Sequence, residues 1–469
     1  MTLDTTGATR SAIDQLLKEH YLGPIREQLN SEALLDRRVE RNTENVDGRQ
    51  VNIPLHTGRT RAIQAALEGG LLPTAQSQTY TTMTFPVGYN YGVIRVHGPA
   101  MASSRTNLGA FIRVLDQEIR GMVRDIKNDR NRQQFGDGSG RLAICTGASA
   151  GAVIPVQQVW DSGNQASAFK HIYPNDRLAL EDVSTTGTAV ALTGTGNYAL
   201  VSSVDYKGKT VTMTATVTAT TAAGDALFKG PDENTAITAW ADDSNFRGID
   251  LGTPNTAKTK KELMGLVGII NGPNGFPKDG ASAYSAMWQA GVGSTYAGSD
   301  LGVAVAAPLQ GIAGDTTWAA NMSFNAGVPR PLTLDLMQQT FDECEEIGQA
   351  TPTILLTSYA VRRKYLDLLV PDRRYTGANT YELDGGFRAV DYNDVPMVVD
   401  KDCPEATIMM LSEPNLAIYR TADWHWLDKD GAILSRVVGR DAWEAILAEY
   451  SEFATDRRNA HGALGDIAI

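Results

Sequence analysis

The sequence has few cysteines and histidines and lacks long apolar runs. Its three cysteines, Cys145, Cys344 and Cys403, lie far apart, which excludes a disulfide framework and a CxxC metal site. The six histidines are scattered and form no pair at helical spacing, so we expect no metal and no cofactor. No apolar run reaches the roughly 18 residues of a membrane span, and the first ten residues lack a signal-peptide core. These absences predict a protein of a reducing compartment with no membrane partner.

Basic charge is also in deficit, with 42 Lys and Arg against 54 Asp and Glu, a net charge of −12. Phosphate contacts require a basic surface, so binding of nucleic acid by bulk electrostatics is not expected. Glycine, in contrast, is abundant: its 45 copies favour a turn-rich scaffold over an active-site carrier. The length of 469 residues alone suggests two to four domains.

The N-terminal region predicts a helix followed by a charged segment. Apolar residues recur at spacings of three and four over 11–29. Residues 31–47 are strongly charged and have only Leu34, Leu35 and Val39 as apolar anchors. Because this segment has too little apolar surface for a core of its own, we expect a flexible arm or packing on a partner.

Residues 49–98 predict a long β-hairpin. Two runs, 50–55 and 79–96, have strand character, and a short helical patch at 62–68 lies between them. An isolated two-stranded ribbon is marginal in water, so a projecting hairpin needs another subunit to cover it. The candidate intersubunit contacts on it are Arg59, Arg61, Glu68, Tyr80 and Phe85. Solvated loop charges explain Arg59 and Arg61 about equally well, because exposed ion pairs contribute roughly 0–1 kcal/mol.

Residues 107–135 form the clearest helix in the sequence. Asn107 is a good N-cap, and one apolar stripe follows at spacings of three and four. The stripe consists of Phe111, Leu115, Ile119, Met122 and Ile126, and the other faces carry Arg113, Arg120, Arg124, Lys127 and Arg130. Since only one face is apolar, we expect the helix to lie along a surface.

The next two regions differ in pattern. Over 151–250, threonines alternate with apolar residues around a turn at 205–209, which predicts strands at 197–204 and 210–217 in a small antiparallel barrel or sandwich. A further short strand is expected near 224–228. Beyond residue 250 the pattern is mixed α/β, with helices at 333–347 and 358–370 and strands at 353–357, 395–399 and 407–411. Residues 443–457 alternate only loosely, and their type stays open.

Two short motifs touch on catalysis. Gly147-Ala148-Ser149-Ala150-Gly151 matches the nucleophile elbow of serine hydrolases, which places Ser between a strand and a helix. Pro155 and the β-branched residues after the motif oppose a helix, so a chance match is the favoured interpretation. Gly208-Lys209-Thr210 is similar to the end of a P-loop but lies in the predicted hairpin turn.

Several short sequence segments follow one another in a characteristic order in the C-terminal half. They are KELMGL at 261–266, STYAG at 294–298, the helix 334–348 followed by TILL at 353–356, residues 366–374 with Pro371 and paired Arg, GF at 386–387 ahead of VPMVVD at 395–400, and AEY at 448–450 before NAHG at 459–462. They follow the arm, the hairpin, the one-sided helix and the inserted β-domain. This order of parts resembles that of the major capsid proteins of tailed bacteriophages, which share the Hong Kong 97 capsid fold. The resemblance covers most of the chain.

The resemblance implies an α+β fold of the Hong Kong 97 type with six parts. These are an N-terminal arm at 1–48, an extended E-loop hairpin at 49–98, a P-domain at 99–150 with the spine helix 107–135, an inserted β-rich domain at 151–250, an A-domain at 251–435, and a returning P-domain strand with the C-terminal tail at 436–469.

The resemblance also implies a structural protein with no catalytic, cofactor-binding or metal site. Such a protein forms pentamers and hexamers that tile an icosahedral shell around double-stranded DNA, without sequence-specific binding. The implied location is the virion capsid, assembled in the host cytoplasm. The implied partners are further copies of the chain, met through the E-loop and N-arm, a separate scaffolding protein, a portal protein and possible decoration proteins.

Two departures from the family pattern refine this expectation. Some members join subunits by an isopeptide bond between an E-loop Lys and a P-domain Asn, but residues 49–98 contain no Lys and 440–458 contain no Asn. We therefore expect non-covalent contacts alone. The 48 residues before the hairpin are also too short for a fused scaffolding region of about a hundred residues, as some members carry, which favours a separate scaffold.

Three alternatives stay open from the sequence. An encapsulin-like nanocompartment shell has the same fold, although the inserted β-domain favours the viral version. A serine hydrolase using Ser149 is the alternative from another class. A tail or portal component is disfavoured because no long coiled-coil pattern is present.

Overall fold

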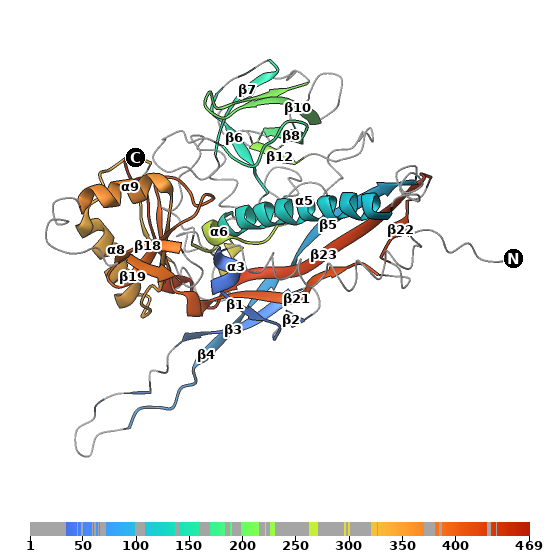
Figure 1. Ribbon diagram of the computed structural model, residues 1–469. Coiled ribbons are helices and arrows are strands. Elements are labelled where there is room, and N and C mark those ends of the chain that lie inside the picture. The colour runs from blue at the N-terminus through green and yellow to red at the C-terminus, as the bar shows by residue number, and fades with distance from the viewer. Residues whose placement is uncertain are drawn as a thin grey trace.

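The computed structural model comprises an elongated central sheet, a barrel above it, an α/β unit at one end and a projecting hairpin (Figure 1). The structure describes residues 34–44, 46–47, 50–58, 60, 62–63, 65, 72–98, 108–136, 138, 140–147, 149, 151–158, 169–182, 188–189, 198–214, 221, 226–229, 262–270, 295–296, 299–300, 320–325, 327–369, 380–383, 387–428, 433–437 and 439–469. The predicted helix at 11–29 lies outside these residues, as does most of the helical patch at 62–68.

The central sheet is built on one long strand, β23 (Ala442–Thr455). Strand β5 (Gly88–His97) pairs antiparallel with it on one side, and β21 (Leu416–Trp426) and the short β22 (Ser435–Arg436) lie on the other. Strand β1 (Glu40–Asn42) adds in parallel to β21. The segment 443–457, whose type the sequence left open, is therefore mostly strand.

Helix α5 (Leu108–Phe135) lies along one face of this sheet, as Figure 1 shows. Its apolar stripe packs on the sheet through Ile119 and Val123, which are buried. Gly92 of β5 allows the close approach, because a Cβ there would lie 2.5 Å from Cδ1 of Ile126. The predicted helix is confirmed, but its last turn does not lie on the surface, since Asn131, Gln133, Gln134 and Phe135 are buried. Arg130, predicted for an outer face, is also buried.

The threonine-rich region forms a closed antiparallel barrel. Its ring runs in the order β10-β11-β7-β6-β12-β8, and β8 pairs back with β10, while β9 extends from β8. Val211 and Met213 point into the barrel core and Thr214 outward, as the alternation predicts. The barrel also contains β6, which lies before residue 151. Its strands are β6 (Ala143–Cys145), β7 (Val153–Gln157), β8 (Arg177–Asp182), β9 (Thr188–Ala189), β10 (Tyr198–Asp205), β11 (Thr210–Met213) and β12 (Ala226–Lys229).

The α/β unit is a seven-stranded sheet in the order β15-β24-β20-β16-β19-β18-β17. One face packs against α8 (Leu334–Glu346) and α9 (Tyr359–Leu368), and the other faces the rest of the molecule. Both helices start where the sequence predicts, because Thr333 and Ser358 cap their first turns. The strands are β15 (Asn321–Ser323), β16 (Ile354–Thr357), β17 (Thr380–Leu383), β18 (Phe387–Tyr392), β19 (Val395–Val399), β20 (Ile408–Leu411) and β24 (Gly462–Leu464).

The hairpin consists of β3 (Gln50–Gly58) and β4 (Thr79–Pro86), paired antiparallel, with β2 (Val46–Asp47) against the base of β3. The predicted pairing is confirmed, but the predicted second run is two strands. It divides at Val87, which is buried, and its second half, β5, leaves the hairpin for the central sheet. The chain therefore connects the hairpin rigidly to β23.

The segment expected to be a flexible arm or to pack on a partner packs on its own chain from residue 34. Helix α3 (Leu34–Arg38) and β1 lie against the central sheet, and Leu35 and Val39 are buried. The remaining described elements are short: α6 (Leu266–Ile270), β13 (Thr295–Tyr296), β14 (Ser299–Asp300) and the 3-10 turns η3 (Glu413–Asn415) and η4 (Arg458–Ala460).

Candidate functional site

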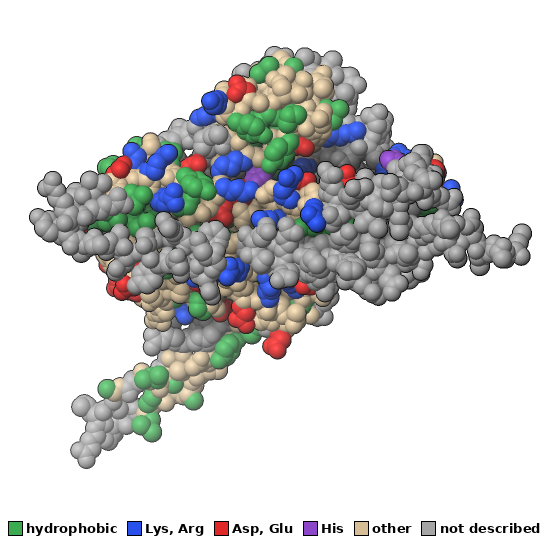
Figure 2. Space-filling model, viewed as in Figure 1, with side chains coloured by type: hydrophobic (Ala, Val, Ile, Leu, Met, Phe, Trp, Pro, Cys, Tyr) green, Lys and Arg blue, Asp and Glu red, His purple; other side chains and the backbone are tan. Residues whose placement is uncertain are grey.

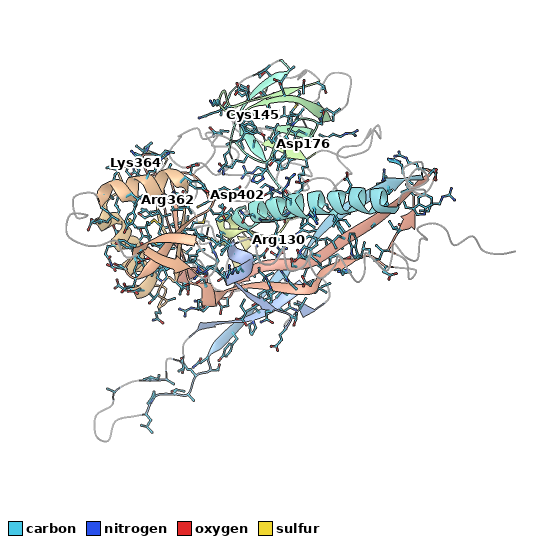
Figure 3. All side chains as sticks on the ribbon, in the orientation of Figure 1. Arg130, Cys145, Asp176, Arg362, Lys364 and Asp402 are labelled. Atoms are coloured by element: carbon cyan, nitrogen blue, oxygen red, sulfur yellow. The ribbon has the colours of Figure 1, made fainter. Side chains whose placement is uncertain are left out.

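The last two turns of α5, residues 128–134, contact the N-terminal segment, the central sheet, the barrel and the α/β unit, and we call them the hub. Arg130 donates to both carboxylate oxygens of Asp36 at 2.7 and 3.1 Å, and to Glu449 of β23. All three side chains are at most 2 % exposed. Figure 3 shows Arg130 beneath α5, toward the central sheet. This triad joins the N-terminal segment, the helix and the longest strand.

The charges in the hub compensate one another. Burial by itself would lower the pKa of Arg130, but the charges of Asp36 and Glu449 raise it, so the guanidinium stays ionised. Burial raises the pKa of Glu449, and Arg130 and Arg420 oppose that rise. Arg420 lies 3.5 Å from Glu449 and also donates to Asp423 at 3.0 Å. Removing one partner of this buried network would leave another buried charge uncompensated, which favours a single arrangement of these side chains.

A second set of hub contacts joins the barrel and the α/β unit. Asn131 donates to Asp400 at 3.0 Å and to Asp402 at 2.6 Å, and both carboxylates follow β19. His171, from the barrel, donates to Asp402 at 2.7 Å. Burial raises the pKa of Asp400, whereas for Asp402 the contacts with His171 outweigh burial and lower its pKa. Both carboxyls thus accept from Asn131, and Asp402, labelled in Figure 3, also bonds to the barrel through His171.

A third set of contacts holds the barrel through β12. Asp129 accepts from Lys229 of β12 at 3.1 Å and from Arg132 at 3.1 Å. Arg132 also donates to Glu262 at 2.7 Å, next to α6. Gly265 allows this segment to approach, since a Cβ there would lie 2.3 Å from the carbonyl oxygen of Gln133. The hub therefore holds four parts of the chain with one short stretch of helix.

The hairpin differs from the hub, because it exposes apolar side chains to solvent. Tyr80 is 66 % exposed, and Leu72, in the segment before β4, is 85 % exposed. Among the described strands β4 pairs only with β3, so its outer edge presents unpaired backbone groups. Neither strand contains a charged residue other than His56. Figure 2 shows apolar and neutral side chains along the described part of the hairpin.

The predicted contact residues fall partly within this surface. Tyr80 is exposed on β4, and Phe85 lies opposite Val51 in the hairpin register. Arg59, Arg61 and Glu68 lie outside the described residues. Sequence analysis missed an aromatic patch on the adjoining sheet, where Tyr89 and Tyr91 are about half exposed and meet Tyr450 edge to face. The alternation of residues 88–97 could have predicted this patch, because Tyr89 and Tyr91 occupy the positions that face away from α5.

The two catalytic motifs lack their structural context. Ser149 lies between β6 and β7, a strand–turn–strand arrangement, and the elbow requires a helix after the Ser. Its hydroxyl donates to the carbonyl of Val153 at 2.6 Å. Gly208 and Lys209 form the β10–β11 turn, where the amides of Lys207 and Gly208 bond to the Asp205 carboxylate. Both motifs are therefore turn structure within the barrel.

Two kinds of feature are absent from the part of the chain that the structure describes. No group of three or more His, Cys, Asp or Glu side chains there is arranged to hold a metal ion. No helix there is long and apolar enough to cross a bilayer.

No family model matches the sequence, and no curated protein matches it either. Solved structures do match, and those that cover the full chain are phage capsid proteins. The capsid of cyanophage A-1(L) is 13 % identical and aligns over 95 % of this chain and 92 % of its own, with a TM-score of 0.47. Mycobacterium phage Bobi is 10 % identical, over 97 % and 98 %, with a TM-score of 0.38. An encapsulin of Synechococcus elongatus is 14 % identical over 29 % of this chain and 50 % of its own, with a TM-score of 0.23.

Proposed function

We propose that this chain is the major capsid protein of a tailed bacteriophage, a structural subunit of the Hong Kong 97 type. The observation that carries the proposal is the β3–β4 hairpin. Its edge strand of eight residues is uncharged, whereas proteins that stay monomeric usually protect such edges with charge, proline or a bulge. Pro86 and the register shift between His56 and Gly58 lie at the two ends of the strand, and residues 81–85 carry none of these devices. Such an uncharged edge on a hairpin that leads away from the body suits a site where another subunit binds.

The contrast with the hub supports the same conclusion. The hub ties the central sheet, barrel and α/β unit into one rigid body, which suits a tile of a shell. The hairpin contributes little to that body and gains its partners from a neighbour. Under this proposal β3 and β4 are the E-loop and α5 is the spine helix. The expected domain boundaries shift, because β6 belongs to the barrel, β21 to the central sheet and β24 to the α/β sheet.

The proposal includes pentamers and hexamers in an icosahedral shell around double-stranded DNA, located in the virion. A net charge of −12 suits a container, because a wall that attracted phosphate strongly would hinder movement of the DNA. Contacts between subunits are non-covalent, since the hairpin lacks Lys. Any intersubunit role of the N-arm falls to residues before 34. A separate scaffolding protein, a portal and decoration proteins are the proposed partners.

Electron microscopy and sedimentation of the purified chain, with and without a crowding agent, test the proposal. Pentamers and hexamers are expected, and uniform closed shells from the chain alone would overturn the separate scaffolding protein. A chain that stays monomeric under both conditions would overturn the whole proposal. Shells that form efficiently in cells but exclude DNA would favour the encapsulin-like alternative.

A further inference from the structure

The two helices that cover the α/β sheet carry opposite charge on their solvent faces. Helix α8 contains Asp335, Asp342, Glu343, Glu345 and Glu346 and no basic residue. Helix α9 contains Arg362, Arg363 and Lys364 in succession, with Asp367 as its one acid. Figure 2 shows basic side chains gathered over α9, and Figure 3 places Arg362 and Lys364 on it.

The acidic residues of α8 are placed against the energetics of their own helix. Glu343, Glu345 and Glu346 lie in or next to the last turn, where the helix dipole disfavours negative charge. Asp342 and Glu345 repel each other at a spacing of three, and Asp342 and Glu346 at a spacing of four. Lys or Arg at these positions would stabilise the helix. The negative charges of these acids can therefore be compensated only by a cation from outside α8.

That cation is not supplied within the described part of the chain. No ion pair there joins the acids of α8 to Arg363 or Lys364 of α9. Arg457 lies nearby, but its guanidinium donates to the backbone carbonyl of Gly348. Gln338 and Gln339 bond to Asp342 and Glu343, at 2.6 and 3.2 Å, and bring no charge.

Each charged face also carries an exposed apolar residue. Tyr359 of α9 is 53 % exposed, and the Arg362 guanidinium lies 5.6 Å above its ring. Ile347, directly after α8, is 52 % exposed. Aromatic and Arg side chains are the types that anchor protein interfaces. Both faces therefore combine an apolar contact with charges of one sign.

We propose that the acidic face of α8 in one copy binds the basic face of α9 in a second copy. The proposed contact is head-to-tail, so that each copy uses α8 toward one neighbour and α9 toward the other, and the rotation between copies closes the ring. The α8 acids then gain the cations that their own helix lacks. This proposal rests on the proposed shell function. It identifies α8 and α9 as the helices that join neighbours around a ring.

Charge reversal tests the contact. Arg363→Glu with Lys364→Glu, and separately Glu345→Lys with Glu346→Lys, should each lower the assembly rate about tenfold at low ionic strength, because steering depends on complementary charge. The second pair relieves the repulsion within α8, so its loss of assembly cannot come from a weakened helix. The chain with all four substitutions should regain assembly, since the charges are exchanged and again complementary.

A matched control and the salt dependence complete the test. Arg124→Glu with Lys207→Glu makes the same change in net charge as the α9 pair, at exposed positions away from both helices, and should assemble as the wild type does. In about 1 M salt, where charges are screened beyond roughly 3 Å, the wild type should slow toward the reversed variants. A wild-type chain that never assembles overturns the shell function and this contact together. A wild type that assembles, with reversed pairs matching the control or with no rescue by the fourfold exchange, overturns the contact alone.

Discussion

The hub of α5 and the β3–β4 hairpin expose and bury opposite kinds of residue. In the hub, polar side chains are buried and each has partners from distant parts of the chain, such as Arg130 with Asp36 and Glu449. In the hairpin, apolar and aromatic side chains such as Leu72 and Tyr80 are exposed. A polar interior and an apolar exterior reverse the usual arrangement. The hub joins four parts of the chain to one another, and under the proposed function the hairpin gains part of its stabilisation from a neighbour.

The largest expected effect comes from breaking the hub. Arg130→Met should destabilise the unassembled chain by about 3–5 kcal/mol, because Asp36 and Glu449 would stay buried without their main counter-charge. Denaturant unfolding measures the change. Arg124→Met on the same helix is the control, since Arg124 is exposed and should shift stability by no more than about 0.5 kcal/mol. Equal shifts for the two variants would show that the hub does not hold the body together.

The second effect is a dependence on pH from His461, which is fully buried. Its Nδ1 accepts from the amide of Ser412 at 3.2 Å, so its Nε2 carries the proton and donates to Thr455 Oγ1 at 3.0 Å. Burial and the nearby charges of Arg458 and Arg457 lower its pKa to about 3.

The sign follows from this lowered pKa. Below pH 6.5 the unfolded chain binds a proton at this site and the folded chain does not, so stability falls as pH falls, by about 1.4 kcal/mol per pH unit. Between pH 6.5 and 5 the loss is about 2 kcal/mol. His461→Gln should remove this part of the slope, and His97→Gln, at an exposed position, should keep it. Unfolding curves at several pH values measure both, and identical slopes for the two variants would contradict the assignment.

The smallest effect on the lone chain should come from the hairpin. Tyr80→Ala should change the stability of the unassembled subunit by no more than about 0.5 kcal/mol, because the side chain is mostly exposed. The yield of assembled particles should nevertheless drop. Tyr173→Ala on the barrel removes a tyrosine of similar exposure and serves as the control for particle yield. A loss of stability in the lone chain on Tyr80→Ala would mean that the hairpin is held by its own subunit, which would break the contrast with the hub.

The sequence predicts the elements whose signals are local. The bounds of α5 follow from one apolar stripe, and α8 and α9 start at cap residues whose hydroxyls bond to the first turn. The barrel strands β10 and β11 follow from alternation around a turn. Strand β23 gives no such signal because it is buried on both faces, so its residues do not alternate.

Long-range contacts explain the remaining misses. Arg130 has the helical position of a surface charge, and only partners 94 and 319 residues away make it an interior residue. Residues 34–42 have too few apolar anchors to predict burial, yet β1 gains backbone partners from β21, more than 370 residues further along the chain. Such pairings depend on topology, which a window of neighbouring residues does not contain.

Strand β24 has a consequence for how the molecule is made. It comprises Gly462–Leu464 and lies between β15 and β20, inside a sheet whose other strands are synthesised earlier. During translation that sheet has a gap until residue 464 emerges from the ribosome. Chains interrupted before this point lack an interior strand of the α/β sheet, and with it a fixed platform for α8 and α9. The α/β sheet can therefore close only after translation has passed β24, the strand that joins β15 to β20.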